Sequence, residues 1–89
     1  MNRKDFEDMV LAQGYEEMPT FEHEDRHLFI HPHHPNNLPM IFTRPYDTVV
    51  FEYLAGKKES NSSGYTLHEA ALLFLVIMEQ HNETPEHEA

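Results

Sequence analysis

The chain has no cysteine among its 89 residues, so neither a disulfide framework nor a thiolate metal site can form. That absence fits a reducing compartment, and we expect a cytoplasmic protein. Basic residues are also scarce, because six Lys and Arg stand against sixteen Asp and Glu and give a formal net charge of −10. Such a charge repels phosphate and argues against direct binding of nucleic acid or an anionic membrane. We expect a partner that is neutral or basic.

Long hydrophobic runs are missing too. The longest one covers the nine residues 70–78, whereas a helix that spans a bilayer needs about 20 apolar residues. The first eight residues, MNRKDFED, enter a charged amphipathic pattern directly and contain no apolar signal region. We therefore expect a soluble protein without a membrane partner or a standard export signal.

The clearest element that the sequence does contain is a helix over residues 67–80. Thr66 and Glu69 have the spacing of a capping box, in which each side chain accepts a hydrogen bond from the backbone N–H of the other residue. The apolar run 70–78 leaves the middle of this helix without a polar side, so most of its circumference must be covered. The rest of the chain provides that cover, or a homodimer through residues 67–78 provides part of it.

A shorter helix is predicted near the N-terminus, over residues 4–13. Phe6, Met9 and Val10 recur at helical spacing, with acidic residues on the opposite side. Gly14 follows the last periodic position, where a glycine commonly ends a helix.

Strand-like segments rich in β-branched and aromatic residues fill the region between the two helices. They cover residues 20–23, 26–31, 38–43 and 47–54. We expect the first two to form a hairpin around a turn at 24–25, and residues 49–54 are also compatible with a helix. The run HPHHPNN at 31–37 contains two prolines and predicts a loop.

The predicted fold is α+β: a helix, three or four antiparallel strands and a second helix, with both helices packed on one face of the sheet. The other face is left to solvent or to a partner. We expect a single domain over residues 1–80, with a mobile linker at 56–64 and a polar flexible tail at 81–89.

One known family shares several of these features. A first helix that closes with Gly14-Tyr15, the run EDRHLFIHP at 24–32 and a final helix that begins near GYTL at 64–67 together resemble HicA. HicA is a small ribonuclease toxin with a fold like that of double-stranded-RNA-binding domains. Alignment on the His-Pro pair places the family's Gly-Ser-His motif on residues 24–26, so the motif is not intact and His27 lies one place after the catalytic position. The resemblance implies this fold, and makes His27 the candidate catalytic residue of a divergent ribonuclease.

Histidines concentrate in the same region, where five of the eight lie between positions 23 and 34. On an extended strand, His23, Asp25, His27 and His31 share one side because their numbers have equal parity. Three imidazoles and a carboxylate suit zinc, nickel or copper, so His23, His27 and His31 form a candidate metal site. The alternative is that these histidines are exposed polar groups, which gain charge between pH 7 and 5.

Other catalytic groups are few. The serines at 60, 62 and 63 lie in the predicted linker, and the chain contains no nucleophile-elbow motif and no phosphate-binding glycine loop.

Eight of the sixteen acidic residues fall within residues 5–25. Together with tyrosines that we expect to be half exposed, they give the following candidates for partner binding: Asp5, Asp8, Glu16, Glu17, Glu22, Glu24, Asp25, Tyr46 and Tyr53. The acidic residues are explained equally well by a need for solubility alone. Of the remaining aromatic residues in the strands, we assign Phe42 and Phe51 to the core.

These observations favour a non-enzymatic acidic protein, without a cofactor, that binds another protein as a regulator or inhibitor. Its negative charge suits a basic target surface of the kind that binds nucleic acid, and its size and charge resemble those of phage inhibitors and immunity proteins in composition. Two alternatives remain open: the HicA-like ribonuclease that uses His27, and a histidine-based module that binds a metal.

Overall fold

The computed structural model describes residues 1–20, 25–53 and 64–83 of the chain. In this part of the chain the helices are α1 (Arg3–Ala12) and α2 (Leu67–Glu83), and the strands are β1 (Glu16–Met18), β2 (His27–Ile30), β3 (Met40–Arg44), β4 (Thr48–Glu52) and β5 (Tyr65–Thr66). A short 3₁₀ turn, η1 (Pro45–Asp47), joins β3 to β4. The predicted α+β class is confirmed, with five strands in place of three or four.

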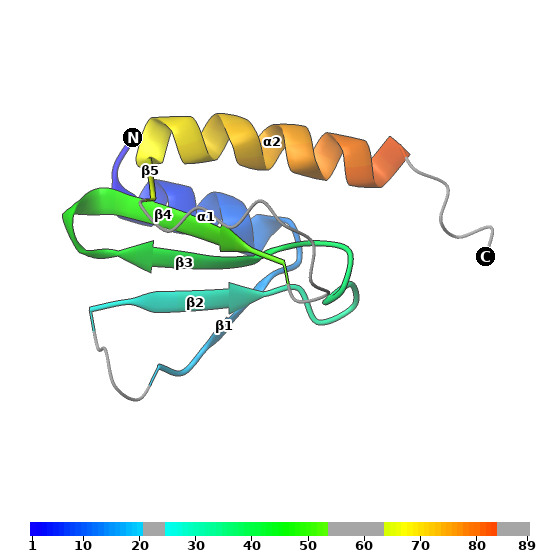
Figure 1. Ribbon diagram of the computed structural model, residues 1–89, viewed down its shortest axis with the longest axis horizontal. Coiled ribbons are helices and arrows are strands. Elements are labelled where there is room, and N and C mark those ends of the chain that lie inside the picture. Colours follow the sequence, from blue (N-terminus) through cyan, green and yellow to red (C-terminus); the bar gives the residue numbers. More distant parts are fainter. Residues whose placement is uncertain (21–24, 54–63, 84–89) are drawn as a thin grey trace.

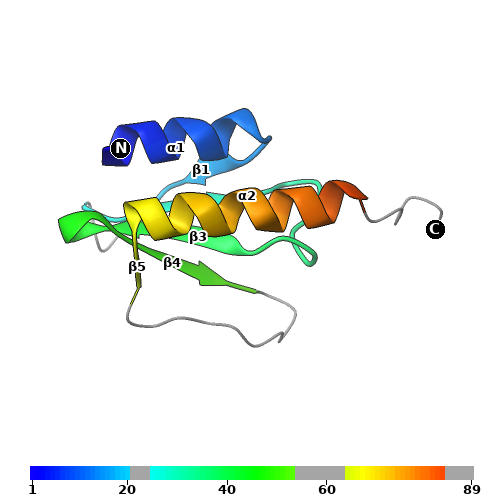
Figure 2. The same cartoon turned by 90° about the horizontal axis from the view of Figure 1, so that it is seen from above.

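The strands form one antiparallel sheet in the order β1-β2-β3-β4-β5, so each strand pairs with the next one along the chain. Both helices lie on the same face of this sheet (Figure 1). They run side by side in one layer, with α1 over the β1 side of the sheet (Figure 2). The predicted packing of both helices on one face is therefore confirmed.

Helix α1 begins with a capping box that involves Asn2. The Oδ1 atom of Asn2 accepts a hydrogen bond of 2.8 Å from the backbone N–H of Asp5, and the Asp5 carboxylate accepts one of 3.3 Å from the N–H of Asn2. Gly14 follows the helix with a φ of 98°, a left-handed conformation in which a side chain is disfavoured. A Cβ atom there would also lie 2.9 Å from Nε2 of His31, so two separate constraints require glycine at this position.

Helix α2 begins as the sequence predicts. The hydroxyl of Thr66 accepts from the N–H of Glu69, and the Glu69 carboxylate accepts from the N–H of Thr66, each at 3.1 Å. The helix continues to Glu83, so the flexible tail predicted from residue 81 starts too early; residues 84–89 lie outside the described chain. Neither described helix is both long and apolar enough to cross a membrane.

The first hairpin is present but displaced. Its first strand is β1, which lies earlier than the predicted segment 20–23, and Glu17 of β1 stands opposite Phe29 of β2. Thr20 is not in a strand; its hydroxyl donates a hydrogen bond of 2.9 Å to the carbonyl of Arg26. Residues 21–24 are outside the described chain, as are the linker residues 56–63.

The region between β3 and α2 also differs in part from the prediction. Residues 49–52 belong to β4, so the helical alternative for that part of 49–54 is wrong, and Leu54 is outside the described chain. Tyr65 and Thr66 add a fifth strand, β5, through pairing with Val49 and Thr48. Two residues are too few to produce an alternating pattern, so the sequence carried no signal for β5.

The core lies between the sheet and the helix layer, and Phe74 of α2 is at its centre. The ring of Phe74 makes edge contacts with Phe6 of α1, at a centroid distance of 6.3 Å, and with Tyr15 before β1, at 5.7 Å. Phe51 is buried there as predicted. Phe42 is not, because it pairs with Val50 and Leu28 on the opposite face of the sheet. Assigning Phe42 to the core was wrong, since sequence does not say which strand face the helices cover.

The apolar run 70–78 is covered on one side only. Ala70, Phe74 and Met78 are buried, whereas Leu72, Leu75 and Val76 are 55%, 52% and 48% exposed. The expectation that the chain covers most of this helix is therefore wrong, because one sheet and one neighbouring helix contact only the inner half of a cylinder.

The two sides of α2 give a direct test of this packing. We expect Phe74→Ala to lower the free energy of unfolding by about 3–5 kcal/mol, because it removes a buried ring and leaves a cavity. Leu75→Ala, at the next position, should cost less than about 0.5 kcal/mol because its side chain is half exposed. Urea denaturation followed by circular dichroism measures both, and equal losses would contradict the described orientation of α2.

Candidate functional site

An apolar surface lies on the sheet face opposite the helices, here called the open sheet face. Its central row crosses four strands, from Met18 in β1 through Leu28 and Phe42 to Val50 in β4. Ile30 and Met40 continue the apolar surface toward one end of the strands. The open sheet face thus consists of Met18, Leu28, Ile30, Met40, Phe42 and Val50, of which five are half-buried and Val50 is 9% exposed.

Strand alternation explains how these residues come to share a surface. Phe29, Ile41 and Phe51 point into the core, so their neighbours in sequence must point to the other side. None of the six open-face residues belongs to the core cluster around Phe74. Within the described chain no helix packs on this face (Figure 1). The sheet therefore has apolar residues on both faces, and among the described residues the helices cover only one of them.

Charged side chains stand at both ends of the open sheet face. Glu16 lies opposite Ile30, and Glu52 lies opposite Met40, so two carboxylates flank the same end. Arg44, opposite Thr48, is at the other end of β3. The surface therefore has an apolar middle, an acidic end and an arginine beyond the apolar row.

The predicted partner-binding acids do not form one patch. Asp5 and Asp8 lie on α1, on the opposite side of the sheet from the open face, and both have local roles: Asp5 caps α1 and Asp8 pairs with Lys4 at 3.0 Å. That pairing raises the pKa of Lys4. Glu16, Glu17 and Asp25 are exposed around the β1–β2 hairpin, and Glu22 and Glu24 lie outside the described chain.

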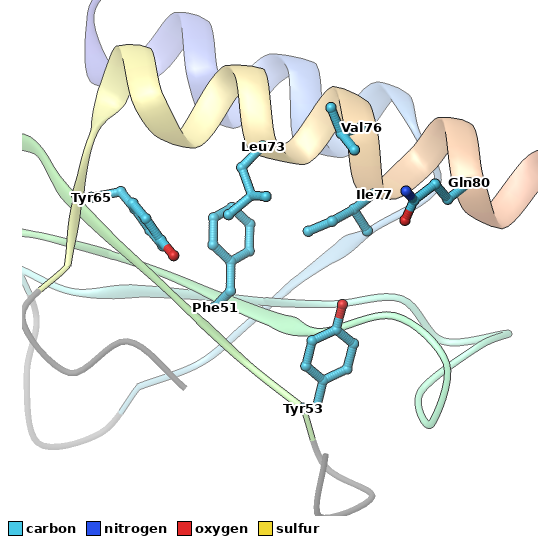
Figure 3. A pocket seen from close by; sticks show the side chains of 7 residues that line it. All are labelled: Phe51, Tyr53, Tyr65, Leu73, Val76, Ile77 and Gln80. Carbon is cyan, nitrogen blue, oxygen red and sulfur yellow. The ribbon is translucent and has the colours of Figure 1, made fainter. Parts of the chain in front are cut away.

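The two predicted tyrosines occupy different places. Tyr46 is 97% exposed in the η1 turn and has a φ of 64°, a left-handed conformation that is uncommon for an aromatic residue. Tyr53, half-buried, lines a groove of about 240 Å³ between α2 and the β4–β5 side of the sheet (Figure 3). The remaining lining of this groove is Phe51, Tyr65, Leu73, Val76, Ile77 and Gln80. Tyr46 and Tyr53 therefore do not share a surface.

His27 belongs to a polar cluster that sequence reasoning missed, here called the Glu7 cluster (Arg3, Glu7, His27 and Thr43). One oxygen of Glu7, Oε2, accepts from the Thr43 hydroxyl at 2.5 Å and from Nδ1 of His27 at 2.7 Å, and pairs with Nε of Arg3 at 3.3 Å. Arg3 also donates to the carbonyls of Thr43 and Asp25. These contacts join α1 to β2 and β3. The contact of Glu7 with Arg3 can be expected from the sequence, because the two residues are one helical turn apart. The contacts of these two residues with His27 and Thr43 cannot, because no local pattern connects positions so far apart in the chain.

The Glu7 cluster fixes the tautomer of His27. A carboxylate only accepts hydrogen bonds, so Nδ1 of His27 must carry the proton, and Nε2 is left with a lone pair when the ring is neutral. The His27 side chain is 34% exposed and that of Glu7 15%. A histidine oriented by a carboxylate has the arrangement of a general base, although the same contacts also serve to dock α1 on the sheet.

Four other histidines meet at the far end of β2, in what we call the histidine corner (His31, His33, His34 and His81). The ring of His31 lies 5.1 Å from that of His34, and His34 lies 4.5 Å from His81 of α2. Nε2 of His31 donates to the Gln13 carbonyl at 3.2 Å, and Nδ1 accepts from the N–H of His33 at 3.4 Å. Burial lowers the pKa of His31, and the nearby His34, His33 and His81 lower it further.

The structure separates the candidate metal ligands. His27 engages Glu7 at one end of β2, and His31 has both nitrogens in hydrogen bonds at the other end. His23 is outside the described chain. Among the described residues, no three His, Asp or Glu side chains are grouped so that they would hold a metal ion. Equal parity placed His27 and His31 on the same side of the strand, but their spacing along β2 is too large for one ion.

Comparison of the chain with known protein families, with curated proteins and with solved structures finds no match.

The histidine corner predicts that stability depends on pH. Because the pKa of folded His31 is below its ordinary value of 6.5, the unfolded chain takes up the proton first as pH falls. The free energy of unfolding should thus decrease as pH drops from 7 through 6.5 toward 5. His31→Gln keeps a donor for the Gln13 carbonyl but does not titrate, so it should reduce this slope.

Thermal unfolding of the dilute protein between pH 7.5 and 5 measures the effect. Asn36→Gln, at an exposed position beside the histidine corner that carries no titrating group, is the matched control and should leave the slope unchanged. A slope that is the same in wild type and His31→Gln would contradict the assignment to His31.

Proposed function

We propose that the chain is a non-enzymatic protein-binding regulator or inhibitor whose docking surface is the open sheet face. The observation that carries the proposal is the row Met18, Leu28, Phe42 and Val50, which crosses four strands and which no helix of the described chain covers. A contiguous apolar surface of this kind on a small protein typically marks an interaction site. Its flatness suits another protein better than a small molecule, which needs a concave pocket.

The charges define the chemistry of the partner. Glu16 and Glu52 flank the acidic end of the open sheet face, and the chain as a whole carries −10. The partner in this proposal is a protein that presents apolar side chains beside a basic region, which meets the two carboxylates. A basic region that otherwise binds nucleic acid fits this description, and its occupation would exclude the nucleic acid. Phosphate itself is repelled by the same charge.

The decisive experiment compares variants in capture from a cell lysate. Phe42→Thr removes the central aromatic ring but keeps a residue suited to a strand, and circular dichroism checks that its fold is retained. We expect a protein that wild type captures and Phe42→Thr loses. Leu11→Asp, at an exposed leucine of α1, is the matched control and should capture the same protein. Capture that is unaffected by Phe42→Thr, or no specific capture at low salt, would overturn the proposal.

Two measurements on the captured protein refine the result. Phe42→Thr should weaken its affinity about 10- to 100-fold, the equivalent of losing roughly 1.5–3 kcal/mol of apolar burial. Glu16→Gln combined with Glu52→Gln should slow association and reduce its dependence on salt, because exposed charges act mainly on the encounter rate. An affinity that rises with salt would contradict a basic partner.

The pair of His27 and Glu7 supports one second candidate, a divergent HicA-like ribonuclease. Its support is the 2.7 Å contact that leaves Nε2 of His27 able to act as a base. Purified protein incubated with labelled RNA tests it. If this candidate holds, His27→Ala abolishes cleavage and Glu7→Gln reduces it strongly, while His33→Ala has no effect. Absence of cleavage by the wild-type protein would exclude it.

A further inference from the structure

Helix α2 carries a second apolar surface, on the side that faces away from the sheet. Leu72, Leu75 and Val76 are about half exposed there, and His68 and Glu79 are exposed beside them. Residues 68, 72, 75 and 79 are spaced by 4, 3 and 4, which is the spacing of a coiled-coil seam. We call these four residues the α2 seam; it has leucines in the middle, a histidine at one end and a carboxylate at the other.

We propose that the α2 seam is the interface of an antiparallel homodimer. A two-fold axis midway between Leu72 and Leu75 places Leu72 against Leu75 of the second copy, and by symmetry the reverse. The same axis places His68 against Glu79 of the second copy. One register therefore satisfies both leucine layers and both His–Glu pairs, in which an imidazole N–H can donate to the carboxylate.

The alternative orientation is unfavourable for the same residues. In a parallel pair, Glu79 meets Glu79 of the second copy and His68 meets His68, so like groups are opposed at both ends. Repulsion between the two glutamates thus disfavours the parallel pair. The antiparallel register makes the seam complementary to itself, which identifies a second copy of this chain as the occupant. The seam extends over only about 17 Å of helix, at 1.5 Å per residue, and we expect a dimer that dissociates on dilution.

The dimer would place the two docking surfaces far from its interface. Since α2 and the open sheet face lie on opposite sides of the molecule (Figure 1), both open sheet faces would point outward. A partner with two binding sites would then be held by both copies, with an avidity greater than that of one contact. Dimerisation through α2 does not depend on the proposed function and would stand if the open sheet face bound nothing.

Sedimentation across a concentration series measures the association itself. We expect Leu72→Asp and Leu75→Asp each to raise the dissociation constant at least about tenfold, because a charge would oppose a leucine. Both positions are exposed in the monomer, so the fold is retained, and circular dichroism verifies this. Leu11→Asp is the matched control, since Leu11 is an exposed leucine (42%) on the neighbouring helix, and it should leave association unchanged.

The orientation is tested by cross-linking, which the absence of native cysteine makes clean. Two variants, His68→Cys and Glu79→Cys, are mixed, with a tag on one to distinguish the products by mass. The antiparallel pair predicts disulfides mainly between the two different variants. Disulfides formed mainly between two copies of the same variant would overturn the proposed register.

Charge exchange gives an independent check. His68→Glu should weaken association, and the double variant His68→Glu with Glu79→Lys should restore it. A monomer at all concentrations would overturn the dimer, as would a dimer that is lost in Phe42→Thr but kept in Leu72→Asp.

Discussion

The contact on which this structure depends is that of Phe74 with Phe6 and Tyr15. Through it, α2 is held against both α1 and the chain that enters the sheet, so the two helices form one layer over one face. Tyr15 is further fixed by a hydrogen bond of 2.9 Å from its hydroxyl to the Pro39 carbonyl, and burial raises its pKa. The consequence is a two-layer fold, in which a helix layer and a sheet each have an inner surface that is buried and an outer surface that is not.

Both outer surfaces are more apolar than a monomer of this architecture requires. A sheet with one solvated face normally alternates apolar and polar residues, yet the central row of the open face has Met18, Leu28, Phe42 and Val50. On α2, the side that faces away from the sheet would normally be polar, yet Leu72 and Leu75 lie there and are about half exposed. Apolar area that stays exposed does not favour folding, and association through these residues is what we propose above. The two surfaces are distinct in shape, since one is a broad sheet and the other a narrow helical seam.

The two polar clusters connect the helices to the sheet. The Glu7 cluster and the histidine corner stand at opposite ends of β2, and each connects a helix to the sheet, through Glu7 of α1 in one case and His81 of α2 in the other. In both clusters, side chains are oriented by hydrogen bonds at the edge of the core. Within the described chain, every buried side-chain nitrogen and oxygen has a partner. These clusters therefore help to position the helices on the sheet.

Local signals in the sequence determined the α+β class, both helices and the glycine that ends α1. Capping at Thr66 and Glu69 and a left-handed Gly14 involve residues within one turn of each other, so they are readable without the fold. Only the tertiary structure decided which face of the sheet the helices cover, and with it that Phe51 is buried while Phe42 is on the open face. It also decided that His27 meets Glu7 and that Leu72 stays exposed. Those outcomes depend on contacts between residues distant in the chain, and the alternation of a strand is the same whichever face is covered.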